Sequence, residues 1–171
     1  MDLPHFRYHP DPIATGSIKK SDRKCLVCGQ ARGYIYYGAI YIEGREYGEC
    51  ICPWCIADGS AHEKLGVEFN DYYAIGTYGN TIPRAVIEEV AYRTPGFSSW
   101  QPKEWPSHCD DAAAFLGRVG YAELVEYGEA AFEAIIYPEE LMETLDKDGS
   151  PTGYLFQCRH CGRYLGDTDC D

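Results

Sequence analysis

The alternation of apolar and polar positions predicts short β elements toward both ends of the chain. Residues 33–48 are rich in Tyr and Ile, with Gly38 and Gly44 as breaks, a composition that predicts a hairpin or bent ribbon. Residues 153–157 (GYLFQ) predict a further strand. The three prolines within residues 1–24 oppose regular helix, so we expect an extended lead-in there.

Helical spacing of apolar residues is typical of the middle of the chain. The pattern predicts one helix from Cys52-Pro53 to before Gly66, one from Pro83 to about Tyr92, a short one capped by Asp110 or Asp111 and carrying Phe115, Leu116 and Val119, one from Ala122 to Ile135, and one from Pro138 to Leu145. Residues 93–108, with prolines and two tryptophans, predict an ordered loop. The expected class is therefore α+β.

Length and composition favour one globular domain. The chain has 171 residues, and 45% of them are apolar, enough to build a core. We expect a single domain over 1–171 that consists of a zinc subdomain (1–66), a mainly helical middle (67–149) and a C-terminal zinc knuckle (150–171) that packs back on the middle. The segment 93–101 can line a binding groove, but its Phe97 and Trp100 favour a loop that plugs the core.

The net charge of the chain limits the kinds of partner that we expect. With 15 Lys and Arg against 27 Asp and Glu, the formal net charge is −12. Nucleic acids and anionic membranes bind through many basic contacts, so neither is an expected partner. An acidic surface suits a basic protein partner instead. The start of the chain lacks the apolar run of a signal peptide, and we expect a cytoplasmic protein with no membrane span.

Nine cysteines carry the clearest chemical signal. Three pairs have C-x-x-C spacing, and in a reducing compartment such pairs are typical of zinc ligands. The first site is assigned to Cys25, Cys28, Cys52 and Cys55. Gly29 after the first pair permits the left-handed backbone of a knuckle, and the second pair begins a helix. Knuckle, ribbon and helix in this order predict a treble-clef-like finger.

The third pair needs further ligands to complete a second zinc site. Cys158 and Cys161 are its firm members, Cys109 is expected to join them, and His108 is the first choice for the fourth ligand. Cys170 is the rival fourth ligand, whereas Cys50 has no assigned role and is read as a buried or free thiol. We expect His160 to point outward from the knuckle. The sequence therefore predicts two zinc ions, the first more firmly than the second.

Together the motifs resemble a known family. The segments FRYHPDPIATGSI, CLVCGQARGYIY, CPWCIADGSAHEK, RTPGFSSWQ, WPSHCDDAAAFLG and YLFQCRHCG, spread from residue 6 to residue 162, are similar to the CbrC family. That resemblance implies a bacterial cytoplasmic protein of uncharacterised activity, associated with tolerance to a DNase colicin. It also implies that the three cysteine pairs and the His108-Cys109 dipeptide belong to the family pattern.

The leading hypothesis is a zinc-stabilised interaction or regulatory protein that is not an enzyme. Ligation by four Cys and His side chains closes a zinc site, and closed sites are structural. One alternative is a zinc-dependent hydrolase with an open site at His108, Cys109, Cys158 and Cys161, in which Asp110 or Asp111 is the base. The other is a dithiol redox protein that uses Cys52 and Cys55.

Overall fold

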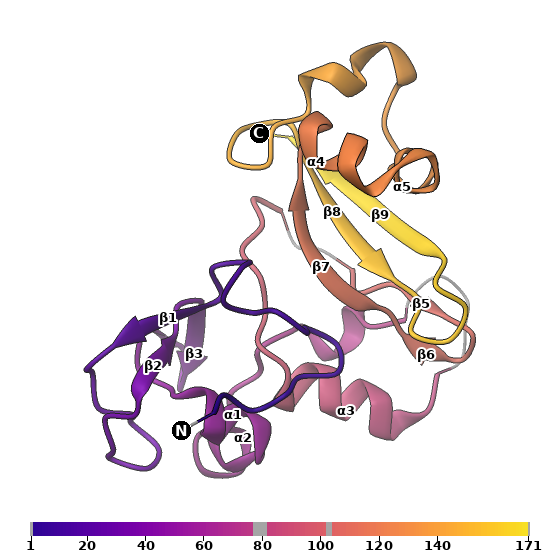
Figure 1. Cartoon of the computed structure of the whole chain (residues 1–171). Helices are drawn as coiled ribbons and strands as arrows, with labels where there is room; N and C mark the ends of the chain where they lie inside the picture. The colour runs from indigo at the N-terminus through magenta and orange to yellow at the C-terminus, as the bar shows by residue number, and fades with distance from the viewer. Residues whose placement is uncertain (1, 77–81, 102–103, 171) are drawn as a thin grey trace.

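The structure is a computed structural model that describes residues 2–76, 82–101 and 104–170. It is a mixed α/β fold in which the β1–β4 ribbons lie at one side and the β7–β9 sheet at the other (Figure 1). The elements are β1 (Ile18–Ser21), β2 (Gly33–Tyr36), β3 (Ala39–Ile42), β4 (Arg45–Gly48), α1 (Pro53–Ala57), α2 (Ser60–Leu65), the 3₁₀ turn η1 (Tyr72–Ala74), α3 (Arg84–Arg93), β5 (Ser107–His108), β6 (Asp111–Ala112), β7 (Ala114–Val119), α4 (Tyr121–Tyr127), α5 (Glu129–Ala134), the 3₁₀ turn η2 (Glu139–Thr144), β8 (Thr152–Gln157) and β9 (Tyr164–Asp169).

The N-terminal ribbons confirm the strands predicted over residues 33–48. β3 and β4 form an antiparallel hairpin, and the break at Gly44 has a φ of 75°. β2 instead pairs antiparallel with β1, a strand within the lead-in that the sequence pattern did not indicate. The apolar faces of these strands, with α1, α2 and Phe69, bury one core. The first cysteine cluster lies inside that core, so its geometry is tied to the packing of this region.

The C-terminal half is organised around a three-stranded antiparallel sheet in the order β7-β8-β9. The short helix predicted to carry Phe115, Leu116 and Val119 is wrong, because these residues belong to strand β7. The residues 115, 116 and 119 satisfy helical spacing, but β7 pairs with β8 along its length. The register shifts between Phe115 and Gly117, and the φ of Gly117 is 142°. The segment from 67 to 149, predicted to be mainly helical, contains α3, α4 and α5 and also the strands β5, β6 and β7.

Glycines shorten the predicted helices. The helix expected over residues 52–66 is two helices, α1 and α2, separated at Gly59, whose φ is 83°. Gly128, with φ 90° and ψ −179°, divides the helix expected from Ala122 to Ile135 into α4 and α5. The helix expected after Pro138 is the 3₁₀ turn η2. The helix predicted from Pro83 to Tyr92 is confirmed as α3.

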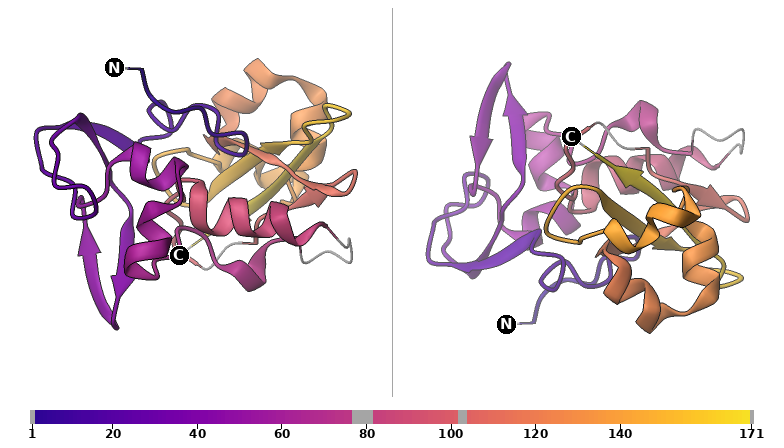
Figure 2. Two further views of the ribbon diagram at one scale, coloured as in Figure 1. Left: turned by 90° about the horizontal axis from the view of Figure 1, so that it is seen from below. Right: turned by 90° about the horizontal axis from the view of Figure 1, so that it is seen from above.

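The helix α3 connects the two halves of the molecule. It contacts α1 and α2 on one side and β6 on the other, and the views from below and above show the ribbons and the sheet on opposite sides of it (Figure 2). Phe97 enters the aromatic core beside the sheet, as predicted, with its ring 4.1 Å from that of Phe115. Trp100 does not, because its side chain is 66% exposed. No helix in the described ranges is long and apolar enough to cross a membrane.

Candidate metal centres

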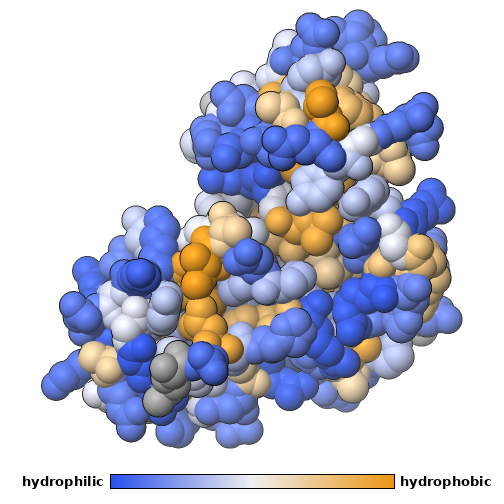
Figure 3. Space-filling model, viewed as in Figure 1, coloured by the Kyte–Doolittle hydropathy of each residue, from blue (hydrophilic) through white to orange (hydrophobic). Residues whose placement is uncertain are grey.

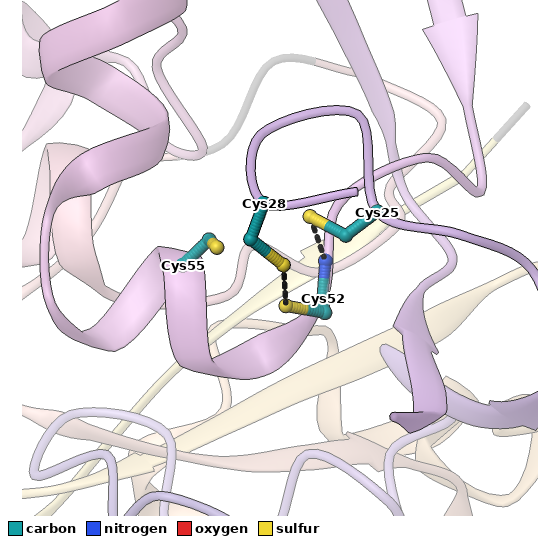
Figure 4. Close-up of side chains that lie close together, drawn as sticks. All are labelled: Cys25, Cys28, Cys52 and Cys55. Atoms are coloured by element: carbon teal, nitrogen blue, oxygen red, sulfur yellow. Dashed lines mark hydrogen bonds between the residues drawn. The ribbon is translucent and has the colours of Figure 1, made fainter. Parts of the chain in front are cut away.

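The first cluster brings together the four cysteines predicted for it. Their Sγ atoms all lie within 4.8 Å of one another (Figure 4). Cys25 and Cys28 come from the loop after β1, Cys52 is the N-cap of α1, and Cys55 lies in the first turn of that helix. Pro53 suits the first helical position because its missing N–H has no partner there in any case. Local sequence therefore determines both halves of the cluster.

The spacing of the sulfurs fits a tetrahedral ion. Bonds of about 2.3 Å from zinc to sulfur place the ligand atoms roughly 3.8 Å apart. The Sγ atoms of Cys28 and Cys52 lie 3.9 Å apart. The amide of Cys52 donates to Cys25 Sγ over 3.3 Å, as backbone amides do toward thiolates at metal centres. Three of the four cysteines are almost fully buried, with exposures of 1–3%. The donor set is therefore suited to a closed zinc site.

The glycine after each knuckle has the left-handed backbone that the sequence predicts. Gly29 has a φ of 70° and Gly162 a φ of 75°. No heavy atom lies within 4 Å of where a Cβ on Gly29 would be, so the glycine is needed for its backbone angle and not for space. The amides of these glycines donate to the carbonyls of Cys25 and Cys158 over 2.8 and 3.0 Å, which closes each turn.

The second cluster groups His108, Cys109, Cys158 and Cys161, again within 4.8 Å of one another. The thiols of Cys109 and Cys161 lie 3.2 and 3.4 Å from His108 Nδ1. Cys158 is buried, while Cys109 and Cys161 are exposed. The four donors fit a zinc ion with one nitrogen and three sulfur ligands, but this centre lies at the surface and the first does not.

A two-residue turn makes the adjacent ligands His108 and Cys109 usable together. β5 and β6 form a hairpin whose loop is Cys109-Asp110, with φ values of 54° and 57°. Left-handed angles at both loop residues are the pattern of a type I′ turn, which usually contains Asn and Gly. Two non-glycine residues there hold backbone strain of about 1 kcal/mol each. The strained turn points the Cys109 thiol at the His108 ring.

Hydrogen bonds set the charge of the thiols in both clusters. A hydrogen bond from the Cys52 thiol lowers the pKa of Cys25 to about 4, whereas burial raises the pKa of Cys55 to about 11. Burial acts to raise the pKa of Cys158, but the amides of Cys161 and His160 overcome it and lower that pKa to about 6. Each cluster thus contains a thiolate at neutral pH, which attracts a cation, and metal binding displaces the remaining protons.

Sequence reasoning missed the residue that supports the second cluster. Asp111 was expected to cap a helix or to act as a base, but it lies in β6 and is 7% exposed. Its carboxylate accepts hydrogen bonds from Tyr8 Oη (2.7 Å), Arg159 Nη1 (2.6 Å) and His160 Nε2 (2.9 Å). His160 therefore points away from the sulfurs and holds the knuckle against the hairpin. The signal for this network is long-range, so no spacing rule could have found it.

Cys50 and Cys170 belong to neither group of described ligands. The carbonyl of Cys50 accepts from the Leu26 amide over 2.7 Å, which places its backbone beside the first knuckle while its thiol stays outside the cluster. Cys170 follows β9, whose pairing of Asp169 with Thr152 lies at the opposite end of β8 from Cys158. The six residues of β8 span about 20 Å. His108, and not Cys170, therefore completes the second group.

Comparison with known proteins corrects the resemblance inferred from the sequence. The model of an uncharacterised protein family (UPF0167) matches residues 3–170. UPF0167 protein Mb2317 of Mycobacterium bovis is 45% identical over 177 residues, which cover 98% of this chain and 93% of the relative. UPF0167 protein PA1536 of Pseudomonas aeruginosa is 40% identical over 176 residues, covering 98% and 97%.

No solved structure matches the chain. The family found is not CbrC, so the expected resemblance to that family is wrong, and the link to colicin tolerance falls with it. The relatives are similar along almost their whole length, so the resemblance concerns the complete arrangement of this chain and not one motif alone. The chain belongs to the uncharacterised protein family UPF0167.

Proposed function

We propose that the protein is a single-domain interaction or regulatory protein held together by two structural zinc ions. The observation that supports this most directly is that each cluster offers four protein ligand atoms. A zinc ion with four protein ligands has no open position for water or substrate, and such sites contribute folding energy instead of catalysis. The ligands would be Cys25, Cys28, Cys52 and Cys55 at the first centre.

The second ion would be bound by His108, Cys109, Cys158 and Cys161. The first centre would have a treble-clef-like form. Its support is the order of the elements: a knuckle at Cys25–Cys28, the β3–β4 hairpin, and then α1 with Cys52 and Cys55 in its first turn. Because the same sulfurs form part of the apolar core, the ion and the packing of this region would stabilise each other.

A zinc-dependent hydrolase is the second candidate, favoured by the exposure of Cys109 and Cys161. A cavity of about 390 Å³ also borders His108. Two observations weigh against it. Four protein donor atoms lie together there, which would leave no position for water on a tetrahedral ion. The carboxylate of Asp111 already accepts three side-chain hydrogen bonds, so it is not free to act as a base. A redox role for Cys52 and Cys55 has less support, because both thiols lie in the four-sulfur group.

The surface of α4, α5 and η2 suits a basic partner. A shallow groove of about 820 Å³ between them is lined by apolar residues, among them Val125, Phe132 and Met142. Its acidic lining residues are Glu129, Glu133, Glu139 and Glu143. The space-filling view shows apolar side chains set among hydrophilic ones on this part of the molecule (Figure 3). An apolar floor with an acidic rim is complementary to an amphipathic segment with a basic face.

Metal analysis of the purified protein tests the zinc proposal. We expect close to two zinc per chain, and one in each of the variants Cys52→Ser and Cys109→Ser. Cys50→Ser is the matched control, since its thiol lies outside both groups, and it should keep both ions. An unchanged zinc content in Cys109→Ser would remove the second centre. X-ray absorption that shows an oxygen ligand at the second centre would favour the hydrolase instead.

A pair of synthetic peptides tests the partner proposal. A helical Leu/Lys peptide should bind and a Leu/Glu peptide of the same length should not, as measured by fluorescence anisotropy. The double variant Glu139→Lys with Glu143→Lys should lose the interaction. Glu140→Lys, on the same turn but not lining the groove, is the control that should retain it. Equal loss in both variants would show that only net charge matters and that the groove is not the site.

A further inference from the structure

A second kind of site is lined by residues of the N-terminal ribbons and of strand β7, and none of its lining residues belongs to a sulfur cluster. It is a cavity of about 530 Å³. Its lining comes from five parts of the chain: residues 15–19 at the start of β1, the β2–β3 connection, Phe69, the loop after α3, and β7, which provides Arg118. Small-molecule pockets in proteins have volumes of about 300–1,000 Å³.

The charge of this cavity is opposite to that of the chain. The whole sequence has 27 acidic and 15 basic residues. Among the described residues that line the cavity there are two cations, Lys19 and Arg118, and no acidic side chain. In an acidic protein, a pocket without carboxylates in its lining favours anions, because both fixed charges of that lining are positive.

Both cations are available to a ligand. Lys19 Nζ lies 3.2 Å from the centre of the Tyr37 ring, which positions the ammonium at the wall of the cavity. Arg118 Nη2 has a long contact of 3.8 Å with Asp148, and both side chains are well exposed. A surface ion pair of that length contributes little, so a bound anion can take the place of Asp148. Four serine and threonine hydroxyls line the same space. Thr15 Oγ1 already donates to His9 Nε2 and Ser99 Oγ to the Gln101 carbonyl, so Ser17 and Ser98 are the ones that can donate to a ligand.

Aromatic side chains form the floor, and two glycines make room for them. Tyr36 and Phe69 are 4% and 7% exposed, with their rings in edge contact at 5.4 Å. A Cβ on Gly38 would lie 2.2 Å from Tyr36 Oη, and a Cβ on Gly96 would lie 2.2 Å from the Phe69 carbonyl oxygen. Neither position accepts a side chain without displacing the floor. The position of this apolar floor is thus set by the backbone.

A buried histidine holds the walls in place. His9 is fully buried, and its ring nitrogens lie 2.8 Å from the Pro95 carbonyl oxygen and 2.6 Å from Thr15 Oγ1. It thereby joins the turn before β1 to the loop after α3. The Tyr37 amide donates to the Ser17 carbonyl over 2.8 Å and fixes the third wall. A cavity held in this way is preformed, so a ligand does not have to order it.

We propose that this cavity binds a small organic anion: a flat ring that carries a phosphate or carboxylate group. The oxyanion would lie between Lys19 and Arg118 and accept hydrogen bonds from the hydroxyls of Ser17 and Ser98. The ring would lie on the floor formed by Tyr36, Phe69 and Phe97. This ligand site shares no residue with either cysteine cluster, although its floor residues Tyr36 and Phe69 pack in the same core as the first one.

Isothermal titration calorimetry on the full-length, zinc-loaded protein tests the proposal with four probes. Adenosine 5′-monophosphate and 4-hydroxybenzoate have a ring and an oxyanion, adenosine lacks the oxyanion, and inorganic phosphate lacks the ring. We expect one of the two ring-bearing anions to bind with a Kd below about 1 mM, and the partial probes to bind at least tenfold more weakly. The better of the two identifies the phosphate or the carboxylate, and higher ionic strength should weaken binding.

Three variants locate the ligand. Lys19→Gln and Arg118→Gln should each weaken binding about tenfold, as expected for a lost charge-assisted hydrogen bond. Lys20→Gln is the matched control: it removes the same charge from the same strand, but Lys20 does not line the cavity, so its affinity should be unchanged. Ala39→Trp should block the cavity without a change of charge.

The proposal is overturned if neither ring-bearing anion binds at millimolar concentration. It is equally overturned if Lys20→Gln weakens binding as much as Lys19→Gln, because general attraction by the strand would then account for the result. Binding to Ala39→Trp with wild-type affinity would place the ligand elsewhere. Thermal unfolding of each variant in the absence of probe verifies that the fold is retained, which the exposure of these side chains leads us to expect.

Discussion

The carboxylate of Asp111 lies 2.9 Å from Nε2 of His160, the histidine inside the C-terminal C-x-x-C pair. The same oxygen accepts a hydrogen bond from Arg159 Nη1, so two knuckle residues are fixed by one side chain of β6. Because β6 follows directly after the Cys109-Asp110 turn, this contact sets the position of one half of the second cluster relative to the other. Outer residues of this kind orient metal ligands and affect affinity.

Asp111→Asn should lower the zinc affinity of the second centre tenfold to hundredfold. The amide has no charge to attract Arg159, and only its oxygen can accept a hydrogen bond. Competition with a chromophoric chelator measures the affinity of each centre. Asp110→Asn, the exposed neighbour, should release zinc as the wild type does. Equal affinities in Asp111→Asn and wild type would show that the knuckle needs no such support.

Thiol counting should distinguish ligands from free cysteines. If the two centres contain seven of the nine cysteines, a thiol reagent should modify only Cys50 and Cys170 in the zinc-loaded protein. Cys170 should react first, since it is exposed while Cys50 is half-buried. After chelation and denaturation all nine should react. Peptide mapping by mass spectrometry identifies the modified sites, and fast labelling of Cys28 or Cys161 would contradict the assignment.

Because His9 is buried, the free energy of unfolding should decrease as the pH is lowered. Desolvation lowers the pKa of His9 from 6.5 to about 4. Between these values the unfolded chain binds a proton that the folded chain excludes, so the contribution is complete above pH 6.5 and decreases as the pH falls toward 4. Between pH 6.5 and pH 5 the loss should be about 1.6 kcal/mol. Urea unfolding at several pH values measures it.

The control for this prediction is His9→Gln, which should be less stable at pH 7.5 because two buried hydrogen bonds are altered. Its stability should nevertheless depend less on pH across the same range, so the difference from wild type narrows in acid. Parallel curves for the two proteins would mean that other groups dominate the acid transition.

The left-handed turn at Cys109-Asp110 should tolerate glycine and reject β-branched residues. Asp110→Gly should keep both zinc ions, since the φ of 57° is open to glycine. Asp110→Val should destabilise the fold by about 1–2 kcal/mol and weaken the second centre, because β-branched side chains clash at positive φ. Unfolding curves and metal content measure both effects. A valine variant as stable as the glycine variant would argue against a strained turn.

Local sequence rules predicted the members of each cluster but not the contacts and turns that position them. Two-residue spacing identified Cys25, Cys28, Cys52 and Cys55, and the structure brings them together; that they bind zinc stays a prediction. The grouping of His108 with Cys109 depends on a turn whose Cys-Asp sequence is unusual for its type. The spacing of Phe115, Leu116 and Val119 fitted a helix, and only pairing with β8 decides for a strand.

The structures of the lead-in and of the loop 93–101 were also predicted from the sequence only in part. Prolines indicated that residues 1–24 are not helical, yet β1 forms because β2 offers it a partner. The loop was expected to plug the core, and Phe97 does so, whereas Ser98 and Ser99 line the cavity. Lys19 and Arg118 are 99 positions apart in sequence and meet there only through the fold. Such long-range proximity has no local signature.

The two clusters differ in how much chain they enclose. The first joins cysteines 27 positions apart, Cys25 and Cys52. The second joins His108 to Cys158, 50 positions apart, and the intervening chain contains β7, the helices α4 and α5, and β8. An ion there would act as a cross-link and close this loop, which removes conformational entropy mainly from the unfolded chain. Helices α4 and α5 could then unfold and refold locally, while the ion keeps both ends of this segment attached to the rest of the molecule.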